Sequence, residues 1–186
     1  VDLTNLQRQV LYRDADIGRP KAEAARDALR VVNPGVEVVA LQKRLGADDL
    51  AGLVAAADVV LDCTDNFAAR HAINRACVAA RKPLVSGAAI RFDAQIMVFD
   101  LREKTSPCYA CVFPEGCAVE EVQCSTMGVF APLTGVVGSL QAMEAAKLLA
   151  GAGETLAGRL LLLDAKRSEW RAVRVRKDPS CAVCAR

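Results

Sequence analysis

Four of the eight cysteines form two pairs with the same spacing, Cys108-x-x-Cys111 and Cys181-x-x-Cys184. A Cys-x-x-Cys turn places two sulfurs on one side of the chain, and two such turns can complete a tetrahedron around Zn²⁺. Because four thiolates leave no position for water, such a zinc ion is structural rather than catalytic. The alternatives are redox dithiols, which usually occur as a single pair, or unrelated core cysteines. The spacing therefore favours a zinc site that joins the C-terminal tail to the middle of the chain.

Three groups of polar residues are the other candidates for chemistry. The first is the donor-rich run Thr4, Asn5, Leu6, Gln7 and Arg8, and the second is Lys21, beside Arg19 in the first turn of a predicted helix. The third is Asp62-Cys63-Thr64-Asp65-Asn66, at the end of a predicted buried strand, where ligands of open α/β sheets collect. A carboxylate there suits Mg²⁺, and Arg8 and Lys21 suit phosphates. Each also has a simpler interpretation, because most Arg and Lys side chains are solvated and Asp65 or Asn66 could only cap the next helix.

The elements that position these groups alternate between helix and strand, which is typical of an α/β domain. We expect helices over residues 20–32, 48–56, 66–80 and 132–149, and strands over residues 36–41, 58–62, 83–87, 94–100, 159–164 and 170–175. The last three strands lack crossover helices of the earlier kind, which predicts a mostly parallel first half and an antiparallel C-terminal extension. Gly135 and Gly138 lower the helix propensity of the last helix and could admit a close neighbour there.

The bulk composition narrows the classes of function. The chain of 186 residues suffices for one domain with a core, and no segment of it resembles a linker. A net charge of +2 and the lack of a dense basic stretch do not favour a nucleic acid partner. Gln141, Glu144 and Lys147 interrupt the longest apolar stretch, which argues against a membrane span. The chain opens with Val1 rather than a basic and apolar leader, and its cysteine pairs suit a reducing compartment, so we predict a cytoplasmic protein.

The motifs, taken together and in order, resemble the ubiquitin-activating-enzyme superfamily, and within it the ThiF/MoeB/HesA family of bacterial adenylyltransferases, with the molybdopterin branch nearest. The resemblance rests on Asn5-Leu6-Gln7-Arg8-Gln9, Gly18-Arg19-Pro20-Lys21, Asp62-Cys63-Thr64-Asp65-Asn66, Val85-Ser86-Gly87-Ala88-Ala89, Ala131-Pro132-Leu133, Gly138-Ser139-Leu140-Gln141-Ala142-Met143-Glu144 and both cysteine pairs. It covers essentially the whole chain.

This resemblance implies a Rossmann-like twisted sheet with helices on both faces, acting as a homodimer. It implies ATP and Mg²⁺ at the strand ends, and adenylylation of the C-terminal Gly-Gly carboxylate of a ubiquitin-like sulfur-carrier protein, as in molybdenum cofactor synthesis. Asn5 and Arg8 match phosphate contacts, the arginine often reaching the partner subunit's site. Lys21 matches the lysine on the phosphates, Asp65 the magnesium ligand and Asn66 its neighbour at the nucleotide.

The resemblance leaves two questions open, which concern the glycine-rich loop and the role of Cys124. The family's glycine-rich phosphate loop and its ribose-holding acidic residue precede the Asn-Leu-x-Arg-Gln motif, so we expect the natural chain to begin upstream and expect nucleotide binding by residues 1–186 alone to be impaired. Relatives carry a cysteine at the place of Cys124 that, in some branches, bonds covalently to the carrier. Glu120 and Glu121 beside it would raise the pKa of the Cys124 thiol, which argues against such a role.

Other functions remain as alternatives. A non-catalytic, zinc-braced module that docks a ubiquitin-like partner would be expected to lose the charges at Arg8, Lys21 and Asp65, all of which are present. A nicotinamide-dependent oxidoreductase has little support, because no G-x-G-x-x-G loop is visible. The only histidine, His71, is mid-helix and is interpreted as an ordinary surface or core residue. Cys63 and Cys77 fall on apolar segments and are predicted to lie in the core.

Overall fold

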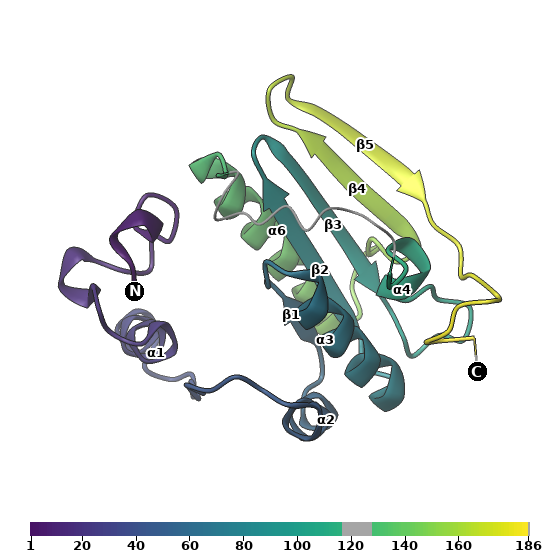
Figure 1. The fold of residues 1–186 in the computed structure, drawn as a ribbon, viewed down its shortest axis with the longest axis horizontal. Helices are drawn as coiled ribbons and strands as arrows, with labels where there is room; N and C mark the ends of the chain where they lie inside the picture. Colours follow the sequence, from purple (N-terminus) through teal and green to yellow (C-terminus); the bar gives the residue numbers. More distant parts are fainter. Residues whose placement is uncertain (117–127, 186) are drawn as a thin grey trace. The chain divides into compact units, whose positions relative to one another are not determined.

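The computed structural model describes residues 1–116 and 128–185, and these divide into two compact units, Val1–Leu45 and Gly46–Arg186 (Figure 1). Each unit is held together by its own internal contacts. The prediction of a single domain over the whole chain stays a prediction.

The first unit consists of two short 3-10 helices and one α-helix. They are η1 (Leu3–Asn5), η2 (Asp14–Asp16) and α1 (Lys21–Val32). Pro20 occupies the N-cap of α1, where its missing N–H costs no hydrogen bond, and the helix ends at Asn33. The chain start folds back on this region, since the Gly18 N–H donates to the Val1 carbonyl at 2.9 Å. The local signals therefore placed α1 correctly.

Residues 36–41 do not form the strand that their β-branched side chains predict. A strand is held by backbone hydrogen bonds to a neighbouring strand, and the described part of the first unit contains none. Side-chain type alone thus misidentified this segment.

The second unit is a five-stranded sheet with the order β1-β2-β3-β4-β5. The strands are β1 (Val60–Asp62), β2 (Leu84–Ile90), β3 (Asp93–Phe99), β4 (Arg159–Asp164) and β5 (Glu169–Arg174). β1 and β2 are parallel and joined by helix α3 (Phe67–Ala80), and all later pairs are antiparallel. The predicted α/β class and the antiparallel extension are confirmed.

Helices cover both faces of this sheet, as Figure 1 shows for α3 and α6 (Ala131–Ala150). On one face Leu84 and Phe99 pack in a cluster with residues of α3 and of the short helix α4 (Tyr109–Val112). On the other face Val85 and Val98 pack against Ala145 and Leu148 of α6. This alternation along each strand is the expected consequence of the two-residue period of a β-strand. Helix α2 (Ala47–Ala56) contributes the buried Val54 to the first of these clusters.

A glycine in β2 sets the closest approach between the sheet and α6. A Cβ on Gly87 would lie 2.5 Å from Cδ of Gln141 and 2.8 Å from Cγ1 of Val137. Gly135 and Gly138 face open space, because a Cβ added at either residue would have no described heavy atom within 4 Å. The close contact therefore depends on Gly87 in the strand, and none of the described residues is the close neighbour that Gly135 and Gly138 were expected to admit.

None of the helices in the described part of the chain combines the length and the apolar character that a membrane crossing requires.

Candidate active site and metal centre

The four paired cysteines converge in space. The Sγ atoms of Cys108, Cys111, Cys181 and Cys184 all lie within 4.8 Å of one another. The distance is 3.7 Å between Cys108 and Cys181, 3.9 Å between Cys108 and Cys111, and 3.4 Å between Cys111 and Cys184. Four sulfurs at about 2.3 Å from a tetrahedral Zn²⁺ ion would be separated by about 3.8 Å. The donor type and the spacing both fit zinc.

Backbone and amide donors hold these sulfurs in place. The N–H groups of Cys108 and Asp178 both donate to Sγ of Cys111 at 3.5 Å. The buried Asn74 of α3 donates from Nδ2 to Sγ of Cys108 at 3.6 Å and accepts from the Tyr109 N–H at 2.9 Å. Such donors stabilise thiolates and orient metal ligands. Sequence reasoning missed Asn74, although a polar residue facing the core side of α3 was a visible signal.

Asp65 and Asn66, in the loop after β1, differ in their hydrogen bonds and in their exposure. Asn66 is the N-cap of α3, and its Oδ1 accepts from the Ala69 N–H at 2.8 Å. Asp65 is exposed, and its only hydrogen bond in the described structure is a long one of 3.4 Å from Nδ2 of Asn66. The capping role therefore belongs to Asn66, and the Asp65 carboxylate stays accessible to a cation.

Asp62, three residues earlier, is a structural carboxylate. Its side chain is 1% exposed and forms an ion pair with Arg70, with Oδ2 3.5 Å from Nη1. Oδ1 accepts from the backbone and hydroxyl of Thr64 at 2.9 and 2.7 Å, and Oδ2 accepts from Ser86 at 3.2 Å. Because its oxygens are occupied by protein donors, Asp62 is not the cation ligand of this loop.

The predicted phosphate residues of the first unit lie around η1. Arg8 donates from Nη2 to Oδ1 of Asn5 at 2.6 Å and from Nη1 to the Thr4 carbonyl at 3.1 Å. The Thr4 hydroxyl and N–H both donate to Asp2, and these bonds hold the pKa of the Asp2 carboxyl below its usual range. The partly buried Leu6 ends η1, while Gln7 is exposed. The structure thus brings the residues of this motif into one turn.

Lys21 and its neighbour Arg19 differ in their contacts. The guanidinium of Arg19 bonds to Asp16 at 2.7 Å and to Asp27 at 2.6 Å, and it lowers the pKa of the Asp27 carboxyl. Lys21 is exposed at the start of α1 and forms no ion pair among the described residues. Its charge is close enough to contribute, after the bonds from Thr4, to the lowered pKa of Asp2. Of the two cations, Lys21 is the one free to meet an anion.

Burial shifts the pKa values of three further titratable candidates, His71, Cys77 and Cys63. His71 is buried, its ring lies edge-on to Tyr109 with centroids 5.3 Å apart, and burial lowers its pKa. Cys77 is buried as predicted, and burial raises the pKa of its thiol to about 12. Cys63 is an exposed residue, contrary to the prediction of a core position, because it follows the last residue of β1. Its Sγ atom nevertheless lies 3.6 Å from Oε1 of Gln141, and partial burial there raises the pKa of the thiol. Cys124, Glu120 and Glu121 lie outside the described residues.

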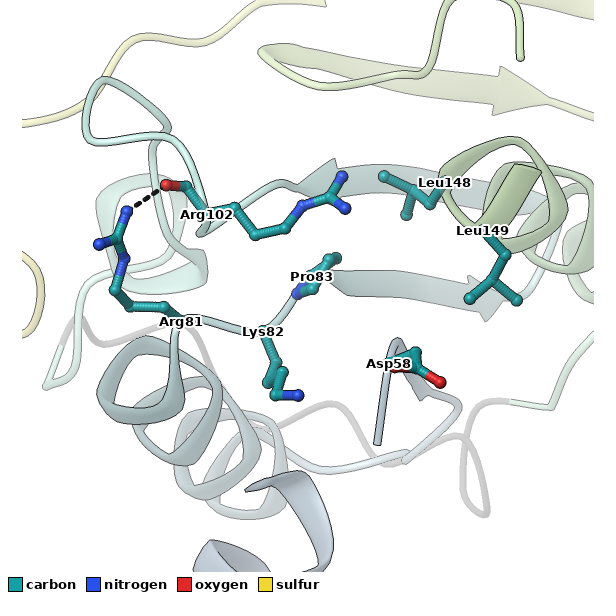
Figure 2. A pocket seen from close by; sticks show the side chains of 7 residues that line it. All are labelled: Asp58, Arg81, Lys82, Pro83, Arg102, Leu148 and Leu149. Carbon is teal, nitrogen blue, oxygen red and sulfur yellow. Dashed lines mark hydrogen bonds between the residues drawn. The ribbon is translucent and has the colours of Figure 1, made fainter. Parts of the chain in front are cut away.

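Figure 2 shows a cavity of about 460 Å³. Its lining residues Asp58 and Pro83 precede β1 and β2, whereas Asp65 follows β1, so the cavity lies at the opposite end of these strands from Asp65. Its lining comprises Asp58, Arg81, Lys82, Pro83, Arg102, Leu148 and Leu149. Two of its cations have protein partners, since Arg102 bonds to Asp100 at 2.8 Å and Arg81 donates to the Arg102 carbonyl, the bond drawn in Figure 2. None of the predicted site residues lines this cavity, so it is not the expected nucleotide site.

Comparison with known proteins agrees with the sequence motifs. The ThiF family matches residues 1–183. The molybdopterin-synthase adenylyltransferase of Escherichia coli K12 is 47% identical over 187 residues, which is 99% of this chain and 73% of the relative. The sulfur carrier protein ThiS adenylyltransferase of the same organism is also 47% identical, over 99% of this chain and 72% of the relative.

Solved structures support the fold. The crystal structure of E. coli MccB with ATP is similar with a TM-score of 0.83 over 99% of this chain and 56% of that one, at 24% identity. At this identity the similarity concerns the fold alone.

Proposed function

The chain belongs to the ThiF family, and we propose that it activates the C-terminal carboxylate of a ubiquitin-like sulfur-carrier protein by ATP-dependent adenylylation, as a nucleotidyltransferase of the molybdopterin-synthase adenylyltransferase type. The observation that carries this proposal is the match to two curated adenylyltransferases along 99% of the chain. The residues with phosphate and cation chemistry are all present within that match.

The reaction requires positioning and charge neutralisation more than acid–base chemistry. A carboxylate oxygen of the carrier attacks the α-phosphorus of ATP, the bond from that phosphorus to the bridging oxygen breaks, and pyrophosphate leaves. A C-terminal carboxyl has a pKa of about 3.5, so it is ionised near neutral pH and needs no general base. This agrees with a chain whose single histidine is buried with a lowered pKa.

We assign the phosphate contacts to Arg8 and Lys21, with Thr4, Asn5, Leu6 and Gln7 forming the turn that leads into Arg8. Lys21 offers an ammonium group without an ion pair among the described residues, and fixed positive charge stabilises the charge that develops on transferred phosphates. Arg8 is oriented by its bonds to Asn5 and the Thr4 carbonyl. Asp65 would hold Mg²⁺ through its exposed carboxylate, with Asn66 beside it at the nucleotide, and the ion would neutralise phosphate charge when bound.

The cysteine cluster would hold Zn²⁺ as a structural ion. Cys108, Cys111, Cys181 and Cys184 supply the four thiolates, and Asn74 orients the first of them. Thiolates of this kind persist in a reducing compartment, which supports a cytoplasmic location. The protein is proposed to work as a homodimer on a carrier that ends in Gly-Gly. A covalent role for Cys124 stays a prediction.

Carrier-dependent exchange of labelled pyrophosphate into ATP tests the proposal, because exchange requires reversible adenylate formation. Exchange that needs both Mg²⁺ and a molybdopterin-synthase small subunit ending in Gly-Gly is the expected result. A carrier lacking the terminal glycine is the control. Binding of the carrier without any exchange would replace the enzyme by the docking module considered above.

A further inference from the structure

Arg70, on the first turns of α3, makes contacts that reach beyond its ion pair. Its side chain is only 8% exposed, and Nη2 donates to the carbonyl of Thr64 in the loop after β1. The same nitrogen donates to the Gly87 carbonyl at 3.2 Å, while Nη1 lies 3.4 Å from the Ser86 hydroxyl. Arg70 therefore ties the loop that precedes Asp65 to the neighbouring strand β2.

Gln141 reaches the same strand ends from the other face of the sheet. The buried Nε2 group of this α6 residue donates to the Asp62 carbonyl at 2.9 Å and to the Val85 carbonyl at 3.2 Å. Its Oε1 lies 3.6 Å from Sγ of Cys63. The missing side chain of Gly87 provides the space for this amide.

We propose that Arg70 and Gln141 are positioning residues, which clamp the loop from Cys63 to Asn66 from both faces of the sheet so that the Asp65 carboxylate points to its cation. This inference rests on the proposed function, since Asp65 is the magnesium ligand only if that function holds. The Thr64 carbonyl is held by Arg70 on one side of Asp65, and Asn66 is held by its cap bond to Ala69 on the other. The backbone of Asp65 is thereby fixed, while its side chain stays exposed.

A purely structural network would affect stability and leave the loop unchanged in the folded protein. We therefore choose variants that remove the clamp without leaving a lone buried charge, which is strongly destabilising. They are the double variant Asp62→Asn/Arg70→Gln, the charge-conserving Arg70→Lys and the apolar replacement Gln141→Met. Arg75→Gln is the matched control, because Arg75 lies on the same helix, is exposed and pairs with Glu115.

The first readout is amide hydrogen exchange at Thr64 and Ala69, which is independent of activity. The Thr64 N–H donates to Oδ1 of Asp62 and the Ala69 N–H donates to Oδ1 of Asn66, so both amides report on how firmly the loop is held. We expect exchange at these amides to accelerate at least tenfold in Arg70→Lys and Gln141→Met, with the rest of α3 and the strands still protected, and no change in Arg75→Gln. If these amides exchange at the wild-type rate in folded Arg70→Lys and Gln141→Met, the clamp does not exist and the inference is wrong.

The second readout is the Mg²⁺ concentration for half-maximal adenylate formation. We expect it to rise at least tenfold in the folded variants, with high Mg²⁺ restoring much of the rate and the KM for the carrier unchanged. An unchanged Mg²⁺ requirement together with faster loop exchange would show that the clamp does not position the ligand, and would overturn the proposal. If the wild-type protein, in its full natural length, forms no adenylate, the proposed function fails, and the exchange experiment still decides whether the clamp exists.

Discussion

The two compact units differ in how they hold their functional side chains. In the second unit a five-stranded sheet buries apolar residues on both faces, and Asp65 lies in the loop after β1, the strand that pairs with β2. In the first unit only Ala24 is buried among the described residues, and Val10, Val31 and Val32 are 95%, 81% and 78% exposed. Arg8 and Lys21 thus stand on helical turns without a core, whereas the cysteine cluster is part of one and the exposed Asp65 follows a strand of the sheet.

Because of this difference, we expect substitutions of site residues in the first unit to change the rate of adenylate formation and to have little effect on the free energy of unfolding. The largest effect belongs to Lys21→Ala, which removes an exposed cation without an ion pair among the described residues. We expect the rate of adenylate formation to fall roughly 10²–10³-fold, because removing one preorganised group that stabilises charge in the transition state typically slows a reaction by about that factor. Thermal unfolding should be unchanged within about 1 °C. Arg30→Ala, at an exposed position in the last turn of the same helix, is the control and should retain activity.

We expect the opposite for the cysteine cluster, where substitution should mainly lower the free energy of unfolding. Cys184→Ser removes one of four converging sulfurs, and metal binding at such a site contributes to folding. We expect loss of bound zinc, measured by elemental analysis. We also expect the free energy of unfolding to fall by roughly 3 kcal/mol or more, which corresponds to a decrease of about 6–12 °C in the thermal midpoint at this chain length. Cys63→Ser, at an exposed cysteine outside the cluster, should keep both zinc and stability. Full zinc content in Cys184→Ser would contradict the assignment.

The contact between β2 and α6 allows a test inside the second unit with two glycines. Gly87→Ala would place a Cβ 2.5 Å from Gln141, and overpacking of this kind costs about 1–3 kcal/mol. Gly138→Ala meets nothing within 4 Å in the described structure and should stabilise the helix by about 0.5–1 kcal/mol. Chemical denaturation measures both changes. Equal effects of the two substitutions would mean that the sheet and the helix approach less closely than described.

These residues also show how far the sequence could predict the structure. The starts of α1 and α3 followed from Pro20 and from the choice of Asp65 or Asn66 as a cap, because caps are local signals, and the structure selects Asn66. The convergence of the cysteine pairs followed from their spacing. Residues 36–41 and Gly87 could not be interpreted in this way, because a strand needs a neighbour and a close contact needs both of its partners. The separate roles of Asp62 and Asp65 depend on which carboxylate turns inward at the strand end, and composition does not reveal that.

The smallest expected effect concerns pH. Burial lowers the pKa of His71 in the folded protein, so the unfolded chain binds more protons below about pH 6.5. The contribution of His71 to stability is complete above that pH. It decreases as the pH falls through the pKa of His71 in the unfolded chain toward its lower pKa in the folded protein. Its Nδ1 lies 3.5 Å from Glu115, which opposes the shift, so the change should be small. Thermal midpoints of wild type and His71→Phe between pH 5 and pH 7.5 measure it. A slope that is equally steep in the variant would exclude His71 as its source.

The central claim is that the protein transfers AMP to the terminal carboxylate of a sulfur carrier, and that the charges of Lys21 and Asp65 are needed for this transfer. Intact-mass spectrometry of a Gly-Gly-ended carrier, incubated with Mg²⁺ and ATP, tests it most directly. The protein, in its full natural length, would be compared with its Lys21→Ala, Asp65→Asn and Arg30→Ala variants. We predict that a carrier one adenylate heavier accumulates with the protein and with its Arg30→Ala variant, but not with its Lys21→Ala or Asp65→Asn variants. A carrier whose mass never changes, or one adenylated equally well by every variant, would contradict the account.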